Sequence, residues 1–273
     1  MGIAPIDRFR EGPGQTRPDY YMPDAQSVVS VGIAYPVGIC DVWGEYGEEG
    51  KTVAPYMWFG YAYLNWELSH VALRVAKLLE AKGHRALPLP PTNPIIYRYF
   101  EKSDADLRFL ADFSHRHAAV AAGLGEFGWN TLLVSPTHGA KQRLVSVITN
   151  APLAPDSLYD GPQICDPRRC AYKCVEMCPV KAMSKTERVA CRIDGRTYEY
   201  AKLDHMRCRW CLDGLFKGSG SRTHIEPPAK IFQRDLFEAG RRRELADVSC
   251  YALTHIDFCG RCMHSCPAPN YET

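Results

Sequence analysis

Cysteines offer the clearest chemistry in this sequence, because thiolates bind soft metals and metal clusters. The chain has 12 cysteines among 273 residues, and all but Cys40 lie between positions 165 and 266. Two motifs end in Cys-Pro, the first with spacers of four, three and three residues and the second with spacers of two and three. The first motif is Cys165, Cys170, Cys174 and Cys178, and the second is Cys259, Cys262 and Cys266. Metal-binding chemistry is therefore concentrated in the second half of the chain.

This spacing predicts two 4Fe–4S clusters that lie close together. In a bacterial ferredoxin run, three thiolates bind one cluster and the fourth, before proline, binds the other. The same logic assigns the first cluster to Cys165, Cys170, Cys174 and Cys266. The second cluster takes Cys178, Cys259 and Cys262 with one of the intervening cysteines, which are Cys191, Cys208, Cys211 and Cys250. The first run departs from the usual spacing most clearly at Cys165.

Zinc is the alternative metal. Two Cys-x2-Cys pairs, Cys208–Cys211 and Cys259–Cys262, have the spacing of a four-cysteine zinc ribbon. Zinc does not account for the Cys-Pro endings or the three-residue spacing before each, so we favour clusters. Cys40 fits an inert buried thiol. In a reducing compartment structural disulfides are not expected.

The elements that position this chemistry lie on both sides of a proline-rich linker at 152–162. Before the linker, apolar patterns predict a buried strand over 27–35, a helix over 64–79 ended by Gly83, and a strand at 86–87. A helix starts at Ser103 and runs to Phe113, and a glycine-rich loop covers 122–130. Further strands are expected over 131–135 and 143–149. After the linker we expect a hairpin at 193–196 and a helix over 231–245, whose basic run at 241–243 is a solvated helix end. The pattern predicts an α+β fold, with one domain over 1–155 and a cysteine-rich domain over 156–273.

Composition excludes several functional classes. A formal net charge of +2 with 23% charged residues gives no broad basic surface, so bulk nucleic-acid binding is not expected. No stretch is long and apolar enough to span a bilayer, and the first residues carry neither a signal-peptide core nor a twin-arginine motif. We therefore expect a cytoplasmic protein.

Several segments together resemble one superfamily, that of the epoxyqueuosine reductases and corrinoid-dependent reductive dehalogenases. The strand entry at 23–29, the segment from Ala122 to Pro136 and the run from Arg143 to Leu153 are similar to the N-terminal core of that superfamily. The segment Asp204–Cys208 resembles the one that supplies a lone ligand to the second cluster in epoxyqueuosine reductases. Positions 259–267, with Asn270, match its last motif. The chain thus looks like a short, divergent member.

This resemblance implies a fold and a set of cofactors. It implies a nitroreductase-like α/β domain that binds cobalamin in the base-off form, followed by a bacterial ferredoxin-like domain with the two clusters. It also selects Cys208 as the fourth ligand of the second cluster. The glycine-rich loop is suited to close approach of a large planar cofactor, although a tight turn explains the glycines equally well. The expected cofactor-binding residues are Arg116, Gly123, Leu124, Gly125, Gly128, Trp129 and Asn130.

The chain also departs from the pattern of these families. Where epoxyqueuosine reductases carry a catalytic Asp, seven residues before an Arg that aligns with Arg116, this chain has Phe109, and His115 replaces a neighbouring Glu. Reductive dehalogenases use a Tyr near the helix entry, where Tyr61 and Tyr63 lie. The candidate proton donors are therefore Tyr61, Tyr63, Asp112, His115 and His117.

Two functions remain open at this point. In the first, the chain is an oxidoreductase in which clusters pass electrons to a corrinoid that reduces a small-molecule substrate. In the second, the chain only transfers electrons, through its clusters, to a corrinoid protein or a partner reductase. Both require an external low-potential donor such as a ferredoxin or flavodoxin. The sequence names neither the substrate nor the oligomeric state.

Overall fold

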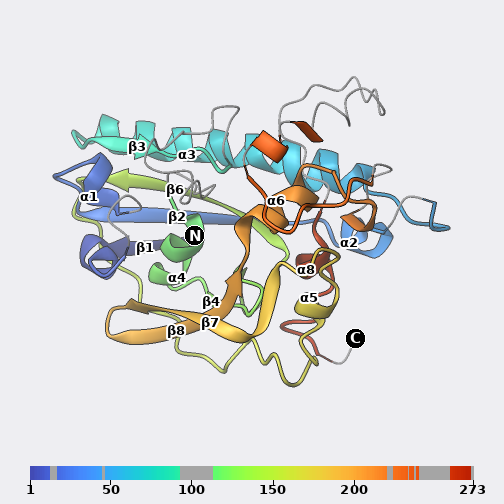
Figure 1. Cartoon of the computed structure of the whole chain (residues 1–273). Helices are drawn as coiled ribbons and strands as arrows, with labels where there is room; N and C mark the ends of the chain where they lie inside the picture. Colours follow the sequence, from blue (N-terminus) through green and yellow to red (C-terminus); the bar gives the residue numbers. More distant parts are fainter. Residues whose placement is uncertain are drawn as a thin grey trace.

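A four-stranded antiparallel sheet lies at the centre of the fold, in the order β1-β2-β6-β3 (Figure 1). The computed structural model describes residues 1–12, 17–44, 47–92, 113–219, 224–232, 234–236, 238–239 and 259–271. The strands of the sheet are β1 (Gly2–Pro5), β2 (Ser27–Ala34), β3 (Ala86–Pro88) and β6 (Gln142–Thr149). Strands β2 and β6 pair along their whole length, from Ser27 opposite Thr149 to Ala34 opposite Gln142.

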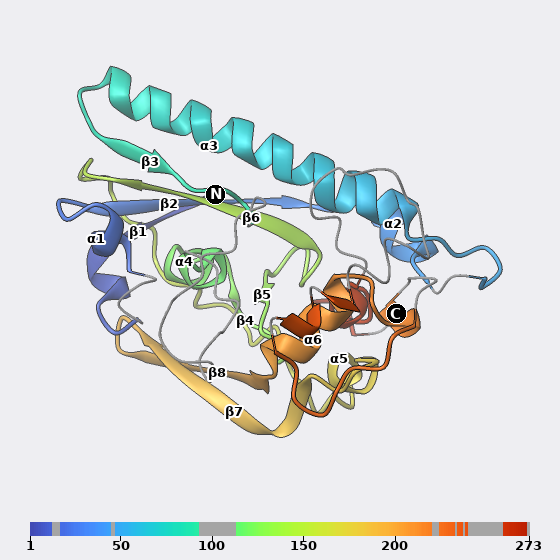
Figure 2. The same ribbon diagram turned by 45° about the horizontal axis from the view of Figure 1, so that its top comes forward.

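Both faces of this sheet are covered. Helix α3 (Leu64–Ala81) packs on one face, and α4 (His115–Ala121) packs on the other (Figures 1 and 2). Successive strand residues point to opposite faces, so Val29 and Val147 contact the α3 side while Val28 and Ile148 contact the α4 side. The apolar run at 27–35 is continuous because β2 is buried on both sides, which confirms the predicted strand.

Helix α3 also confirms its prediction. Its buried residues recur every three to four positions and face the sheet; they are Asn65, Leu68, Ala72, Ala76 and Leu79. The helix ends where Gly83 adopts a φ of 85°, which only glycine adopts readily, and the backbone N–H of His84 donates to the Leu79 carbonyl at 3.1 Å. A π-helix, η3 (Tyr56–Tyr63), leads directly into α3. Such helices are rare and frequently occur at functional sites.

The cysteine-rich half contributes a hairpin and several short helices. The hairpin strands are β7 (Met183–Ile193) and β8 (Arg196–Leu203). Asp194 and Gly195 connect them with φ values of 51° and 74°, the positive angles of a type I′ turn, so the predicted hairpin is confirmed. The helices are α5 (Lys173–Glu176), α6 (His205–Leu212), η4 (Lys217–Ser219) and α8 (Arg261–His264).

Contacts cross the linker that separates the two predicted domains. The hairpin packs against the α4 side of the N-terminal region (Figures 1 and 2), where the Tyr200 and Phe127 ring centroids lie 4.9 Å apart. The Arg8 guanidinium pairs with Asp194 at 3.1 Å and donates to the carbonyls of Ala121 and Asp156, both at 2.7 Å. The segments on either side of position 155 therefore share one apolar core.

The remaining elements include several that the sequence patterns did not indicate. Strand β1 and the start of α4 at His115 were not expected, and the strand expected over 131–135 is reduced to β5 (Leu133–Val134). The predicted helix start at Ser103 lies outside the described residues, as does most of the helix expected over 231–245. The short elements are η1 (Ile6–Phe9), α1 (Pro18–Tyr21), α2 (Val37–Val42) and β4 (Glu126–Phe127).

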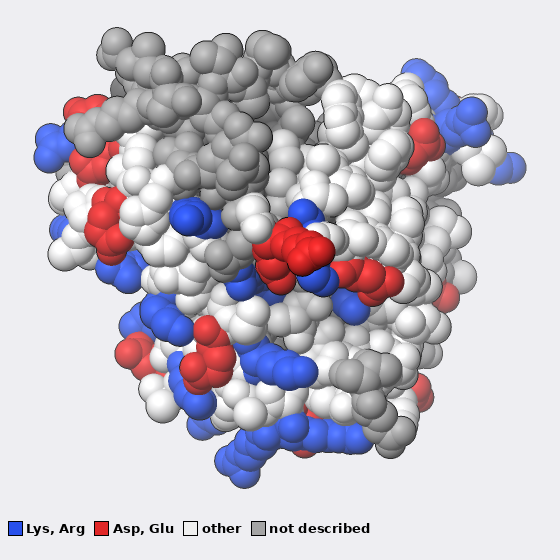
Figure 3. All heavy atoms as spheres, turned by 90° about the vertical axis from the view of Figure 1, so that its right-hand side faces the viewer, with Lys and Arg blue, Asp and Glu red and all other residues white. Residues whose placement is uncertain are grey.

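Charges of both signs are mixed on the surface. On the face in Figure 3, basic and acidic side chains lie interspersed among uncharged residues. Exposed ion pairs contribute to this balance, for example Lys185 with Glu176 at 2.8 Å and Lys202 with Glu187 at 2.6 Å. In the part of the chain that the structure describes, no helix is both long and apolar enough to cross a membrane.

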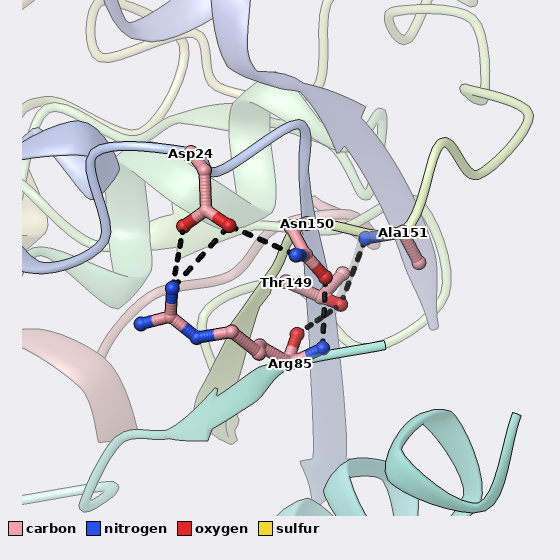
Figure 4. A network of polar contacts seen from close by, with 5 residues as sticks. All are labelled: Asp24, Arg85, Thr149, Asn150 and Ala151. Carbon is pink, nitrogen blue, oxygen red and sulfur yellow. Dashed lines mark hydrogen bonds and ion pairs between the residues drawn. The ribbon is translucent and has the colours of Figure 1, made fainter. Parts of the chain in front are cut away.

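A polar network fixes the far end of the sheet (Figure 4). The Asn150 side chain accepts from the Arg85 backbone N–H at 2.8 Å and donates to Asp24 at 2.9 Å, while Arg85 pairs with Asp24 at 3.3 Å. The Thr149 hydroxyl donates to the Arg85 carbonyl at 2.7 Å and accepts from the Ala151 N–H. The network joins the start of β3, the end of β6 and the turn before β2.

We expect Asn150→Ala to lower the free energy of unfolding by about 1–2 kcal/mol, because it removes two side-chain hydrogen bonds that are each worth about 0.5–1.5 kcal/mol. Urea unfolding followed by circular dichroism measures this change. The control is Arg10→Ala, which removes an exposed pair with Asp7 and should change stability by less than about 0.5 kcal/mol. Equal effects from the two variants would contradict a structural role for the network.

Candidate functional site

The structure gathers four cysteines from opposite ends of the cysteine-rich half, here called the first thiol group: Cys165, Cys170, Cys174 and Cys266. Burial, followed by electrostatic interaction with neighbouring thiols such as Cys266, raises the pKa of both Cys165 and Cys174 to about 12. At Cys165 a hydrogen bond opposes this rise in pKa, because the backbone N–H of Trp129 donates to its sulfur at 3.2 Å. The group matches the ligand set expected for the first cluster.

Polar contacts hold the first thiol group in place. The Glu126 carboxylate accepts from the backbone N–H groups of Ile164 and Cys165 at 2.8 and 2.6 Å. The Tyr271 hydroxyl donates to the Ile164 carbonyl at 2.7 Å and accepts from the Asp166 N–H at 2.6 Å. Glu126 on β4 and Tyr271, near the C-terminal end of the described chain, therefore fix the segment that carries Cys165.

A second thiol group contains five cysteines: Cys178, Cys208, Cys211, Cys259 and Cys262. Burial, then interaction with Cys259, Cys208, Cys174 and Cys178, raises the pKa of Cys262. The involvement of Cys174 shows that the two groups are neighbours. Asp204 caps α6 by accepting from the N–H groups of Met206 and Arg207, both at 3.0 Å. This helix carries two of the thiols three residues apart, so both lie on one side of it.

Cys211 was one of the alternatives that the spacing left open for the fourth ligand, although the resemblance favoured Cys208. A hydrogen bond with the Cys259 thiol, and then burial, raises the pKa of Cys211, and its side chain is only 2% exposed. Cys208 also interacts electrostatically with Cys211 and Cys262. The structure thus brings both candidates for the fourth ligand together and leaves the choice between them to experiment.

The arrangement fits a polyatomic cluster better than a single ion. Within the described ranges, no three His, Cys, Asp or Glu side chains are placed to hold one metal ion. Thiolates around one zinc lie about 2.3 Å from it, whereas each iron of a cubane takes one thiolate, which spreads the four ligands around a larger body. Buried thiols that repel one another as thiolates also require a cationic partner. The donor set therefore suits iron–sulfur clusters.

The remaining cysteines lie apart from these groups. Cys40 packs against an apolar cluster around Tyr35 and Trp43, and burial raises its pKa. Cys191 lies on β7, where burial raises its pKa to about 11. Cys250 is outside the described residues.

A large cavity of about 1590 Å³ opens between the sheet and the cysteine-rich half. Small-molecule pockets are usually about 300–1,000 Å³, so this cavity has room for a ligand larger than a typical substrate. Its described wall includes Tyr61 and Arg143 together with all five cysteines of the second thiol group. None of the four cysteines of the first thiol group is among the described wall residues. The second thiol group is therefore the one that a ligand in the cavity would approach.

The two predicted tyrosines lie in different environments. Tyr61 is 5% exposed and lines the cavity, and its hydroxyl is 2.8 Å from that of Thr92. The Arg143 guanidinium lies 4.0 Å above its ring and donates to Asn65 at 3.0 Å. Tyr63 is 44% exposed and packs against Trp58, Phe59 and Trp66. Only Tyr61 is placed to act on a ligand in the cavity.

The start of α4 places three further predicted residues in the cavity wall. Nε2 of His115 donates to the Pro90 carbonyl at 2.8 Å, and its Nδ1 accepts from the Ser146 hydroxyl at 3.0 Å. Arg116 donates to the Thr131 carbonyl and, at 2.8 Å, to its hydroxyl. Burial lowers the pKa of His115 and of His117 to about 4, so both rings are neutral at pH 7. Asp112 lies outside the described residues.

The glycine-rich segment has a different environment from the one its prediction assumed. Asn130 lines the cavity and donates to the Cys262 carbonyl at 3.1 Å, whereas Gly123, Leu124, Gly125, Gly128 and Trp129 are not among the described wall residues. A Cβ on Gly123 would collide with the Ser157 carbonyl, and one on Gly125 with that of Val134. These glycines thus allow close packing of backbone on backbone. Their role in cofactor binding stays a prediction.

Arg143 is the residue of this site that we did not predict to act there. It lies in β6, and its guanidinium points to the tyrosine ring rather than to solvent. The sequence signal for this role is that Arg143 is a charged residue near the start of β6, a strand that is otherwise mostly apolar. Sequence alone does not reveal that this strand end opens into a cavity.

No protein-family model matches the chain. Curated relatives do match it: a tetrachloroethene reductive dehalogenase of Dehalobacter restrictus is 36% identical over 107 residues, which are 35% of this chain and 19% of that protein. An epoxyqueuosine reductase of Bacillus cereus is 27% identical over 170 residues, which are 62% of this chain and 39% of that protein. The chain therefore spans well under half the length of these relatives.

The fold is similar to part of a reductive dehalogenase. The structure of the catabolic reductive dehalogenase NpRdhA in complex with 3-bromo-4-hydroxybenzoic acid matches 90% of this chain and 31% of its own, with a TM-score of 0.53 and 18% sequence identity. The curated relatives support membership of the chain, as a divergent member, in the superfamily of epoxyqueuosine reductases and reductive dehalogenases.

The neutral histidines predict a loss of stability in acid. The pKa of His115 falls from 6.5 to about 4 on folding, so the unfolded chain binds the proton first and stability decreases as the pH falls from about 6.5 towards 4. The ring borders a cavity, where solvent screens part of the effect. We therefore expect the free energy of unfolding to decrease by about 1–2 kcal/mol between pH 7 and pH 5. Urea unfolding at the two pH values should show a smaller decrease for His115→Gln than for the wild type. His70→Gln, on the exposed side of α3, should behave like the wild type; if His115→Gln does so too, His115 is not buried as a neutral ring.

Proposed function

We propose that this chain is an iron–sulfur, cobalamin-dependent reductase. The observation that carries the proposal is that the second thiol group forms part of the wall of the 1590 Å³ cavity, together with Tyr61 and Arg143. Electrons held by a cluster at these thiols would reach a ligand in the cavity without crossing the protein interior. The relatives named above are reductases and support the same reading.

Eight thiolates would hold two 4Fe–4S clusters. The first thiol group, Cys165, Cys170, Cys174 and Cys266, would hold one. Cys178, Cys259 and Cys262 with Cys208 would hold the other, and Cys211 is the competing fourth ligand. Trp129 and Ala182 would each donate a backbone N–H to a ligand sulfur, at 3.2 Å from Cys165 and from Cys178. Such donors stabilise the negative charge of a bound cluster.

The cavity would take the corrinoid. When bound, a base-off cobalamin would supply a strongly reducing low-valent cobalt for an organic substrate. Cavity size supports this assignment, and Asn130 would contact the cofactor from the side of the second thiol group. Arg116 would hold an anionic group of the cofactor or substrate, since its described hydrogen-bond partners are the uncharged groups of Thr131; it also interacts electrostatically with Tyr200 and Cys208.

Among the predicted proton donors, Tyr61 fits the role best. It is buried in the cavity wall, and the Arg143 guanidinium above its ring would stabilise the negative charge left after proton transfer. His115 uses both ring nitrogens in hydrogen bonds to protein groups, so it would orient the start of α4 rather than donate a proton. An external low-potential donor, such as a ferredoxin or flavodoxin, would supply the electrons.

Protein reconstituted under anaerobic conditions should bind about eight irons and eight acid-labile sulfides per chain, as two cubanes require. We expect Cys208→Ala to lose about half of the iron, while Cys211→Ala and Cys40→Ala retain all of it. Colorimetric iron and sulfide assays measure this. Loss of iron in Cys211→Ala but not in Cys208→Ala would reverse the ligand assignment. Wild-type protein that binds only four irons per chain, together with zinc, would overturn the two-cluster proposal.

The reconstituted protein should also bind one cobalamin with its dimethylbenzimidazole displaced from cobalt. Electron paramagnetic resonance of the cobalt(II) form should lack the superhyperfine splitting of an axial nitrogen. Arg116→Gln should weaken cobalamin uptake, whereas Arg10→Gln, on the surface, should not. Absence of uptake by a protein that holds both clusters would replace this proposal with the electron-transfer function.

A further inference from the structure

The first thiol group lies apart from the cavity and reaches towards the protein surface. None of its four cysteines is among the described wall residues of the cavity, whereas all five of the second group are. Cys170 is only half-buried, and its two chain neighbours, Arg169 and Ala171, are exposed. The two groups are neighbours, because Cys174 interacts electrostatically with Cys262. The first group is therefore placed between solvent and the thiols that face the cavity.

The surface around Cys170 and Cys174 carries an excess of positive charge. Between positions 165 and 185 there are five basic and two acidic residues, a formal excess of three positive charges. Three exposed basic side chains flank these two cysteines in the sequence, and no carboxylate of the described residues lies within ion-pair distance of them. They are here called the basic rim: Arg168, Arg169 and Lys173.

Both acidic residues of this segment already have partners within it. The Asp166 carboxylate accepts from the backbone N–H groups of Arg168 and Arg169 at 3.0 and 3.1 Å. Glu176 forms an ion pair with Lys185 at 2.8 Å. The side chains of the basic rim are thus available to a negatively charged partner, and charge of one sign on a surface raises the rate at which such a partner associates.

An exposed apolar side chain lies beside the rim. Met177 directly follows α5, the helix that carries Lys173 and Cys174, and it is 41% exposed. Methionine is enriched in protein–protein interfaces, where charged residues occupy the edge rather than the centre. Complexes of electron-transfer proteins are weak and have small interfaces. One apolar side chain beside three basic ones suits such a short-lived complex.

We propose that the basic rim and Met177 form the docking surface for an acidic electron-carrier protein, which reduces the cluster at the first thiol group. In each encounter one electron passes from the reduced carrier to the oxidised cluster, so that the carrier is oxidised, the cluster is reduced and no bond forms or breaks. The second cluster then receives the electron at the cavity wall. The inference rests on the proposed function, since it requires both clusters.

A protein carrier fits this surface better than RNA, the other common polyanion. An RNA substrate has to bring its reacting group to the cavity, and no residue of the basic rim is among the described wall residues. A carrier only has to come close to a cluster, and the rim flanks the half-buried Cys170.

The test uses Arg168→Glu/Lys173→Glu in the reconstituted full-length protein. Arg169 is kept, because its guanidinium lies 4.6 Å above the ring of Tyr271, which holds the segment that carries Cys165. The probe is a reduced, acidic plant-type ferredoxin, and anaerobic stopped-flow absorbance measures the rate of cluster reduction. We expect the second-order rate constant at low salt to fall by about tenfold or more. The iron content, and the extent of reduction by dithionite, should stay at the wild-type values.

Two control variants and a salt series make the result specific. Arg168→Lys/Lys173→Arg keeps the charge and should keep the wild-type rate. Arg74→Glu/Lys82→Glu makes the same change of charge on and just after α3, which lies on the other side of the sheet from α5 (Figures 1 and 2), and should lower the rate by less than about twofold. Raising the salt from about 0.1 to about 1 M shortens the Debye length from about 10 to about 3 Å, so it should slow the wild type and have little effect on Arg168→Glu/Lys173→Glu.

The outcomes separate this inference from the proposed function. Wild-type protein that fails to bind two clusters would overturn the proposed function before any carrier is added. If both clusters bind, equal ferredoxin rates in the wild type and in Arg168→Glu/Lys173→Glu overturn the docking surface. Loss of iron from that variant also overturns it, since the side chains would then stabilise the cluster. An unchanged rate with weaker binding of a short hairpin RNA would instead assign the surface to nucleic acid.

Discussion

Crowding of buried thiols at one end of the molecule is the constraint on which the rest of the structure depends. Thiolates in such an environment repel one another and have lost their hydration, which is why burial raises the pKa of Cys165, Cys174 and Cys262. Two backbone N–H groups, from Trp129 and Ala182, reach thiol sulfurs, but hydrogen bonds alone do not replace a cation. The donor set of these loops therefore suits a group that brings positive charge to them.

The antiparallel sheet provides the rigid frame against which these loops are held. Strands β2 and β6 are buried on both faces between α3 and α4, so their ends are fixed in space. Arg143 at the start of β6 and His115 at the start of α4 reach the cavity from these fixed positions. The β7–β8 hairpin then packs on the α4 side from the cysteine-rich half, and the second thiol group lines the same cavity as Tyr61.

Sequence alone predicted the features that depend on local pattern. The apolar run of β2, the three- and four-residue spacing in α3 and the Asp194-Gly195 turn were all recognisable because each follows from nearest-neighbour geometry. The first thiol group was predicted as well, since the ferredoxin rule links cysteines that are distant in the chain. Two features were not predictable in this way: the packing of Gly123 and Gly125 against distant carbonyls, and the position of Arg143 over Tyr61. Each depends on a tertiary contact that leaves no periodic signal in the sequence.

The joining of Cys165 with Cys266 in one thiol group has a consequence for biosynthesis. The two residues are separated by about 100 residues, which a ribosome adds in roughly 5–20 s. The strands β1, β2, β3 and β6 and the helices α3 and α4 all precede Cys165 and can pack while translation continues. The proposed first cubane, in contrast, would have to wait for the last motif of the cysteine-rich half. During this interval the nascent chain carries reactive, unligated thiols, so oxygen and competing metals would act on it chiefly at this stage.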